Sequence, residues 1–280
     1  MASFPSTAMP DPSQAAWLQN THTHKQGAYL ISTRKLPILK AGPIDAMTAR
    51  LGIPIPEMIF GDNLVSISHQ PTGWSIAFTA EAALDRVDKT GKSMLRVAYA
   101  GEWSSSREKT SAGISEVVKP FDWSYTTDYT GTETAGATGE ALKGAEVDIP
   151  LELLKRRDPI LFHDEVVLYE SELDDNGISI VTVKVRVMAQ RMLLLCRAFM
   201  RLDNVLVRIR DTRVYVDFEK DEVIREYIAR ESKFADVKMR LMRSGLHPDH
   251  ITAVMRDAQQ VAEHVDIVQR GTESLSFAKS

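Results

Sequence analysis

The sequence predicts an α+β protein with a mostly antiparallel β-sheet core, peripheral helices and a helical C-terminal tail. Strand patterns gather in the middle of the chain, whereas helical patterns stand near its edges. A parallel sheet is built from strands that alternate with helices along the chain, and this sequence shows no such alternation. The clearest strand covers residues 178–188, where valines at 181, 183, 185 and 187 alternate with polar residues.

The first half of the chain predicts two short helices and a hairpin. Pro43 suits the first turn of a helix, and Gly52 can adopt the left-handed conformation that ends one. Alternating polarity around the turn at residues 71–73 predicts a hairpin of residues 64–68 and 74–78. A second helix follows over residues 80–89. The stretches 104–115 and 130–146 are rich in Ser, Thr and Gly and are predicted to be loops.

The second half adds a short helix at residues 150–156, a strand at 160–169 and a long hairpin. Segments 191–202 and 205–210 flank Asp203 and Asn204, a pair that tolerates positive φ angles. A two-residue turn there pairs Leu202 with Val205. The pairing predicts one face with six side chains, Arg197, Phe199, Arg201, Leu206, Arg208 and Arg210, and puts Ile209 on the other face.

Four arginines on one face repel each other unless carboxylates satisfy them. Those carboxylates belong either to this chain, which carries more acidic than basic residues, or to a partner. Helical spacing returns from Phe234 to Gly245 and again after Pro248. We therefore divide the chain into a disordered tail (residues 1–26), a main domain (27–231) and a helical C-terminal extension (232–280).

Composition excludes several classes of function. With 34 basic and 38 acidic residues and a pI near 6.0, we expect no nucleic-acid partner. The apolar run at residues 192–200 is too short and too charged for a membrane span. Cys196, the single cysteine, permits neither an internal disulfide nor a cysteine zinc cage and suits a reducing compartment. We expect a cytoplasmic protein, with the nucleus as a second location.

Compact catalytic motifs are missing from the sequence. We find no Gly-rich phosphate loop, no His-Glu-x-x-His metal face and no Gly-x-Ser-x-Gly elbow, and we predict no cofactor and no metal. The histidine pairs at 22 and 24 and at 247 and 250 lack further ligands. Acidic residues between 164 and 175 offer paired carboxylates for a hydrolase, although a solvated strand edge explains them more simply.

Several long stretches of the chain together resemble the TIPRL family, whose fungal founder is Tip forty-one, a regulator in the TOR pathway. The resemblance covers most of residues 27–232. Its ordered strings are IPEMIFGDN (55–63), VKPFDWSYTTDYTG (118–131), LKRRDPILF (154–162), DEVVLYESELDDNGIS (164–179), VKVRVM (183–188), RIRDTR (208–213) and IREY (224–227).

The resemblance implies a non-catalytic protein that binds the C-terminal tail of type 2A-like phosphatase catalytic subunits. It also implies a link to the adaptor alpha-four, called Tap forty-two in yeast. Positions matching the family's tail groove are Ile149, Ile209, Asp211 and Tyr227. Where relatives carry an acid after Phe78, this chain has Ala82.

To these four positions we add Arg197, Arg208 and Arg210 as candidate partner-binding residues, because guanidinium groups suit the terminal carboxylate of a phosphatase tail. Two alternatives stay open. One is a scaffold that acts through the helical tail, and the other is the acid/base hydrolase.

Overall fold

The structure is a computed structural model that describes residues 17–90, 121–173 and 176–277. Its smaller sheet is antiparallel, with the strand order β1-β2-β4-β5-β6. The five strands are β1 Thr21–Gln26, β2 Tyr29–Arg34, β4 Leu64–His69, β5 Ser75–Thr79 and β6 Thr132–Thr134. The predicted hairpin is β4 and β5. The predicted disorder of residues 1–26 is wrong for Thr21–Gln26, which pair with β2 along their full length.

The larger sheet has eight strands in the order β3-β8-β9-β10-β11-β12-β13-β7. Each neighbouring pair in it is antiparallel, which confirms the predicted α+β class. The strands are β3 Met58–Ile59, β7 Lys143–Gly144, β8 Phe162–Ser171, β9 Gly177–Val187, β10 Arg191–Leu202, β11 Leu206–Asp217, β12 Glu222–Lys233 and β13 Ile267–Ser276.

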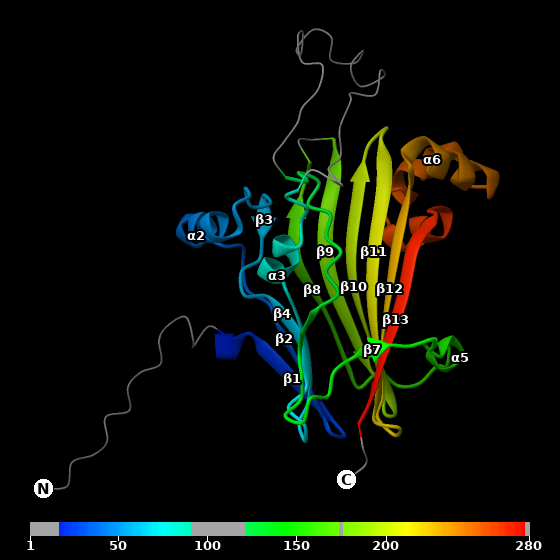
Figure 1. Ribbon diagram of the computed structural model, residues 1–280. Coiled ribbons are helices and arrows are strands. Elements are labelled where there is room, and N and C mark those ends of the chain that lie inside the picture. The colour runs from blue at the N-terminus through cyan, green and yellow to red at the C-terminus, as the bar shows by residue number, and fades with distance from the viewer. Residues whose placement is uncertain (1–16, 91–120, 174–175, 278–280) are drawn as a thin grey trace, which may run out of the picture.

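The main core lies between the two sheets, which face each other in Figure 1. The alternating valines of β9 point into it, as their period of two predicts. Trp74 and Phe78 enter from the smaller sheet, and Tyr169 enters from the larger one. We call the side of the larger sheet that faces this core the inner face, and the opposite side the outer face.

Short helices flank the sheets. Helix α2 Ala41–Leu51 ends at Gly52, whose φ of 69° is the left-handed conformation expected there. Helix α3 Ala80–Asp85 ends earlier than the predicted residue 89. Helix α5, predicted at residues 150–156, covers Leu151–Leu154. The predicted loop at residues 104–115 lies outside the described residues.

The C-terminal region is helical only in its first part. Helices α6 Phe234–Arg243, α7 Pro248–Val254 and α8 Ala258–Val261 precede a 3-10 turn, Ala262–His264. The chain then returns as β13 and pairs with β12. The prediction of a helical extension is therefore wrong for Ile267–Ser276, because this segment completes the main sheet.

The β10–β11 connection has a different register from the predicted one. Leu202 pairs with Leu206, so the loop has three residues, and Asn204 has a φ of 62°. A three-residue loop with a left-handed residue is a common hairpin connection. The shift by one residue moves every side chain of β11 to the other face. The predicted face with four arginines is therefore wrong: Arg197 and Arg201 lie on the outer face, and Arg208 and Arg210 on the inner face.

Candidate functional site

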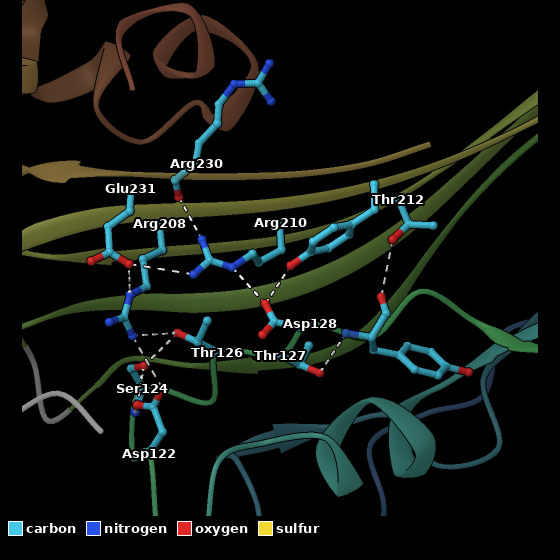
Figure 2. A network of polar contacts seen from close by, with 12 residues as sticks. Asp122, Ser124, Thr126, Thr127, Asp128, Arg208, Arg210, Thr212, Arg230 and Glu231 are labelled. Carbon is cyan, nitrogen blue, oxygen red and sulfur yellow. Dashed lines mark hydrogen bonds and ion pairs between the residues drawn. The ribbon is translucent and has the colours of Figure 1, made fainter. Parts of the chain in front are cut away.

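Arg208, Arg210 and Tyr227 lie on the inner face and hold the segment 122–129 against the sheet (Figure 2). Arg208 donates from Nε to Glu231 over 2.6 Å and forms an ion pair with Asp122 at 3.4 Å. Arg210 donates from Nε to Asp128 Oδ1 over 2.9 Å, and the Tyr227 hydroxyl donates to the same oxygen over 2.6 Å. These three side chains already have partners within the chain.

Burial raises the pKa of Asp122, and hydrogen bonds from Ser124 together with the charge of Arg208 oppose that rise. Burial also raises the pKa of Tyr227, and its hydrogen bond to Asp128 acts in the same direction. The inner-face network joins a buried carboxylate, Asp122, to an exposed one, Asp128. Its ion pairs and hydrogen bonds attach the segment 122–129 to strands β11 and β12.

On the outer face, Arg197 is paired across strands with Asp211. Its Nε and Nη2 atoms each donate to one carboxylate oxygen over 2.7 Å. The Asp211 side chain is fully buried. Two parallel hydrogen bonds from one guanidinium to one carboxylate are among the strongest side-chain contacts in proteins.

Three further arginines lie over the same region of the outer face. Arg213 bonds Glu226 over 2.8 Å and lies 3.6 Å from Asp211. Arg270 bonds Glu226 over 2.7 Å and also bonds the exposed Asp148. Arg230 completes the set, 3.7 Å from Asp211. We call the four side chains the arginine layer: Arg197, Arg213, Arg230 and Arg270.

The arginine layer carries more positive charge than the carboxylates beneath it can balance. Four guanidinium groups share three carboxylates, the buried Asp211 and Glu226 and the exposed Asp148. The buried Nη1 of Arg230 has no hydrogen-bond partner among the described residues. Burial lowers the pKa of Arg230, and the charges of Arg213 and Arg197 lower it further, although Asp211 opposes them. An added anion would relieve this repulsion.

A cleft of about 320 Å³ adjoins Arg197 on the outer face. It lies between the segment 256–259 and strands β9 and β10. Its apolar residues are Ile180, Leu195 and Phe199. Its charged residues are the cations Lys184, Arg197 and Arg256 and the acids Glu165 and Asp257, of which Glu165 pairs with Lys184. An apolar floor beside guanidinium groups suits a peptide that ends in an apolar residue and a carboxylate.

The structure separates the seven predicted site residues into two groups. Ile149, Ile209, Asp211 and Arg197 belong to the outer face, and Arg208, Arg210 and Tyr227 to the inner face. Ile209 is fully buried beneath α6 and α7, and Ile149 is buried against Tyr215 and Ile224. Both isoleucines are core residues in this structure.

Sequence reasoning missed three of the four members of the arginine layer. Arg213 was hidden by the register error, which put odd-numbered residues of β11 on the wrong face. Arg230 and Arg270 were missed because no strand was assigned to residues 222–233 or 267–276. For Arg230 the available signal was its spacing of two residues from Ile228 and of four from Glu226, which puts all three on one face of a strand.

Asp164 and Glu165, the first two acidic residues of the predicted cluster, do not form a carboxylate pair, and Asp174 and Asp175 lie outside the described residues. Asp164 accepts a hydrogen bond from Thr33 and pairs with Lys35, whereas its neighbour Glu165 pairs with Lys184. Burial works to raise the pKa of Asp164, but the bonds from Lys35 and Thr33 prevail and lower it. Adjacent strand residues point to opposite faces, so Asp164 and Glu165 do not converge on one substrate.

Neither a metal-binding cluster nor a membrane-spanning helix is present among the described residues. They contain no group of three or more His, Cys, Asp or Glu side chains that could hold a metal ion. None of their helices combines the length and apolar character needed to cross a membrane.

The family match and the relatives of this chain all point to the same family. Residues 58–238 match the family model described as the TIP41-like family. Over 287 residues the chain is 37% identical to a Saccharomyces cerevisiae protein named type 2A phosphatase activator TIP41, covering 97% of this chain and 80% of that relative. It is 31% identical over 253 residues to the Schizosaccharomyces pombe type 2A phosphatase activator tip41, covering 89% and 96% of the two chains.

A Homo sapiens TIP41-like protein is 42% identical over 216 residues, which is 75% of this chain and 77% of that relative. The family match runs from β3 into α6 and includes strands of both sheets. The chain belongs to the TIP41-like family.

Proposed function

We propose that this protein binds the catalytic subunit of type 2A-family Ser/Thr phosphatases and regulates it without catalysing a reaction. The observation that carries the proposal is its similarity to two fungal proteins named type 2A phosphatase activators, over 97% and 89% of this chain. Regulation without a catalysed reaction requires a surface that contacts the phosphatase subunit.

The surface that best suits this role is the outer face, where the arginine layer meets the cleft beside Arg197. We infer that the C-terminal tail of the phosphatase subunit binds there. Its terminal carboxylate would approach the guanidinium groups, and an apolar side chain would enter the space next to Leu195 and Phe199. The surplus charge of the layer and the unbonded Nη1 of Arg230 support this placement.

The proposal extends to a role in TOR signalling, to a cytoplasmic location with the nucleus as a second one, and to a link with the alpha-four adaptor. The family resemblance is the support for these three statements. The scaffold alternative, in which the C-terminal helices act alone, is less favoured because those helices cover Ile209 and form a core with β11.

The experiment measures the affinity of the purified protein for a purified type 2A catalytic subunit by calorimetry. Substitution of Asp211 or Ile209 would mix folding with binding, because both are fully buried. Exposed cations are better probes. We choose the double variant Arg256→Glu with Arg270→Glu, and Lys25→Glu with Lys40→Glu as a control with the same charge change away from the outer face.

We expect the outer-face double variant to bind at least about tenfold more weakly, since each reversed charge repels the tail carboxylate. The control pair should bind like the unaltered protein. Equal loss in both pairs would point to a general charge effect and remove the outer-face assignment. If the unaltered protein forms no complex with the subunit, the proposed function itself is wrong.

A further inference from the structure

Strand β13 has an open edge over residues 267–271. On the side away from β12, strand β7 pairs only with Glu273 and Ser274 of β13. The Ala145 N–H adds one hydrogen bond to the Thr272 carbonyl. Beyond that point no strand in the described part of the chain pairs with β13 on this side. All five residues from 267 to 271 are exposed, including Ile267 at 57% and Val268 at 59%. Figure 1 shows this strand at the margin of the sheet, with α5 near one end and α6 near the other.

The other margin of the same sheet is protected. At β8, Phe60 donates its backbone N–H to the Leu168 carbonyl, and the Asn63 amide donates to the Val167 carbonyl. Lys35 and Asp164 add charge there. Covering or charging an edge strand is how proteins prevent unwanted pairing. The β13 edge has neither cover nor proline over residues 267–271. Its pairing with β12 shifts register opposite Ala229 and Arg230, and its one charge, Arg270, is directed to Glu226 and Asp148.

The hydrogen-bonding direction of the open edge follows from its neighbours. The Thr272 carbonyl points toward β7, because it accepts from the Ala145 N–H. Backbone groups that point to one side of a strand recur every second residue. The N–H and C=O of Arg270 therefore point outward as well, away from β12 and toward solvent. An ideal Cβ on Gly271 would meet no atom within 4 Å, so the space on the inner side of this edge is open too.

We propose that the β13 edge at residues 267–271 takes up an extended, acidic segment of the partner as an added strand. The inference rests on the proposed function for the identity of that partner, the phosphatase catalytic subunit. An added strand pairs with the outward N–H and C=O of Arg270. Its alternate side chains lie on the outer face beside Arg270 and Ile267, which pair with Ile228 and Arg230 on either side of a bulge at Val268. A carboxylate then meets the edge of the arginine layer, and an apolar side chain covers the exposed isoleucine.

Charge complementarity selects an acidic segment over a second copy of this chain. The half-exposed Arg270 and the less exposed Arg230 border the edge on the outer face. A second copy would bring its own Arg270 and Arg230 to the same border, which adds like charges where the layer already has a surplus.

The test compares Arg270→Pro with Arg270→Ala for binding to the purified catalytic subunit. Both variants lose the guanidinium group, but only the proline variant also loses the outward N–H. Proline is tolerated on an edge strand where its missing N–H faced solvent, so both variants should fold, which circular dichroism checks. We expect the alanine variant to bind a few-fold more weakly, and the proline variant at least about tenfold more weakly than the alanine variant.

Amide hydrogen exchange of the unaltered protein gives a second measurement that needs no variant. The Arg270 amide should exchange rapidly in the free protein and at least about tenfold more slowly in the complex. Equal affinity of the two variants, or an unprotected Arg270 amide in a formed complex, would overturn this inference and leave the proposed function intact. A concentration-dependent dimer in analytical ultracentrifugation that protects the same amide would overturn it in favour of a second copy. Absence of any complex would instead count against the proposed function.

Discussion

Arg197 lies directly opposite Asp211 across the β10–β11 ladder and donates two hydrogen bonds of 2.7 Å to its fully buried carboxylate. This pair is the innermost contact of the arginine layer. A buried ion pair contributes little net stability over an apolar pair, but removing one partner leaves an uncompensated charge. Such a pair fixes geometry, and here it holds the Arg197 guanidinium against the buried Asp211 carboxylate.

Arg197→Ala should lower the free energy of unfolding by about 3 kcal/mol, because it removes both hydrogen bonds from the buried Asp211 carboxylate. Arg270→Ala is the matched control, since that side chain is half exposed and should cost less than about 1 kcal/mol. Urea unfolding followed by circular dichroism measures both values. Equal losses would mean that Arg213 and Arg230 compensate for Arg197.

Ile209→Ala should destabilise the protein by about 2 to 5 kcal/mol, the usual cost of a cavity in a packed core. Ile209 is fully buried under α6 and α7. Leu151→Ala, at an exposed position of α5, should change stability by less than about 0.5 kcal/mol. Thermal unfolding compares the two. A near-neutral Ile209→Ala would show that the C-terminal helices do not pack firmly on β11.

Alkaline pH should destabilise the protein through Tyr215. Burial raises the pKa of Tyr215 to about 12, and Asp217 also raises it while Arg191 opposes the rise. The unfolded tyrosine has a pKa of about 10, so the unfolded state loses its proton first. The contribution of Tyr215 is therefore complete below about pH 10 and declines as the pH rises toward 12.

Tyr215→Phe should remove this part of the alkaline loss, which urea unfolding between about pH 9 and 11.5 detects. At neutral pH the substitution should be nearly neutral, because the Tyr215 hydroxyl has no hydrogen-bond partner among the described residues. Tyr169→Phe is the contrast, since it loses a 2.8 Å hydrogen bond to the Tyr125 carbonyl and should cost about 1 kcal/mol. An unchanged alkaline slope in Tyr215→Phe would contradict the raised pKa.

A chain that ends after Glu231 should fail to fold stably. It would lack β13, which pairs with β12 over nearly its whole length, and the helices that cover Ile209. The exposed apolar surface should bind the dye ANS, and the cooperative unfolding transition should disappear. A soluble truncated chain with a sharp transition would show that residues 27–231 form an independent domain.

The sequence predicted the fold class, the β4–β5 hairpin and the strands β8 to β11, because these depend on local patterns. The valines of β9, the turn before β5 and Gly52 each have a short-range physical cause. The candidate binding site was harder to predict than these elements. A single extra residue in the loop after Leu202 reversed the assignment of β11, although Asn204 does adopt the predicted positive φ.

The amino-acid order by itself determined which segments extend, which coil and which side chains alternate, since periodicity and turn residues act over a few positions. It also contains the segments that resemble the family. Only the tertiary structure decided that Arg197, Arg213, Arg230 and Arg270 share one surface, because strand register and the return of β13 depend on pairing between residues distant in the chain. Alternation tells which residues share a face within one strand, but only the pairing tells which faces meet.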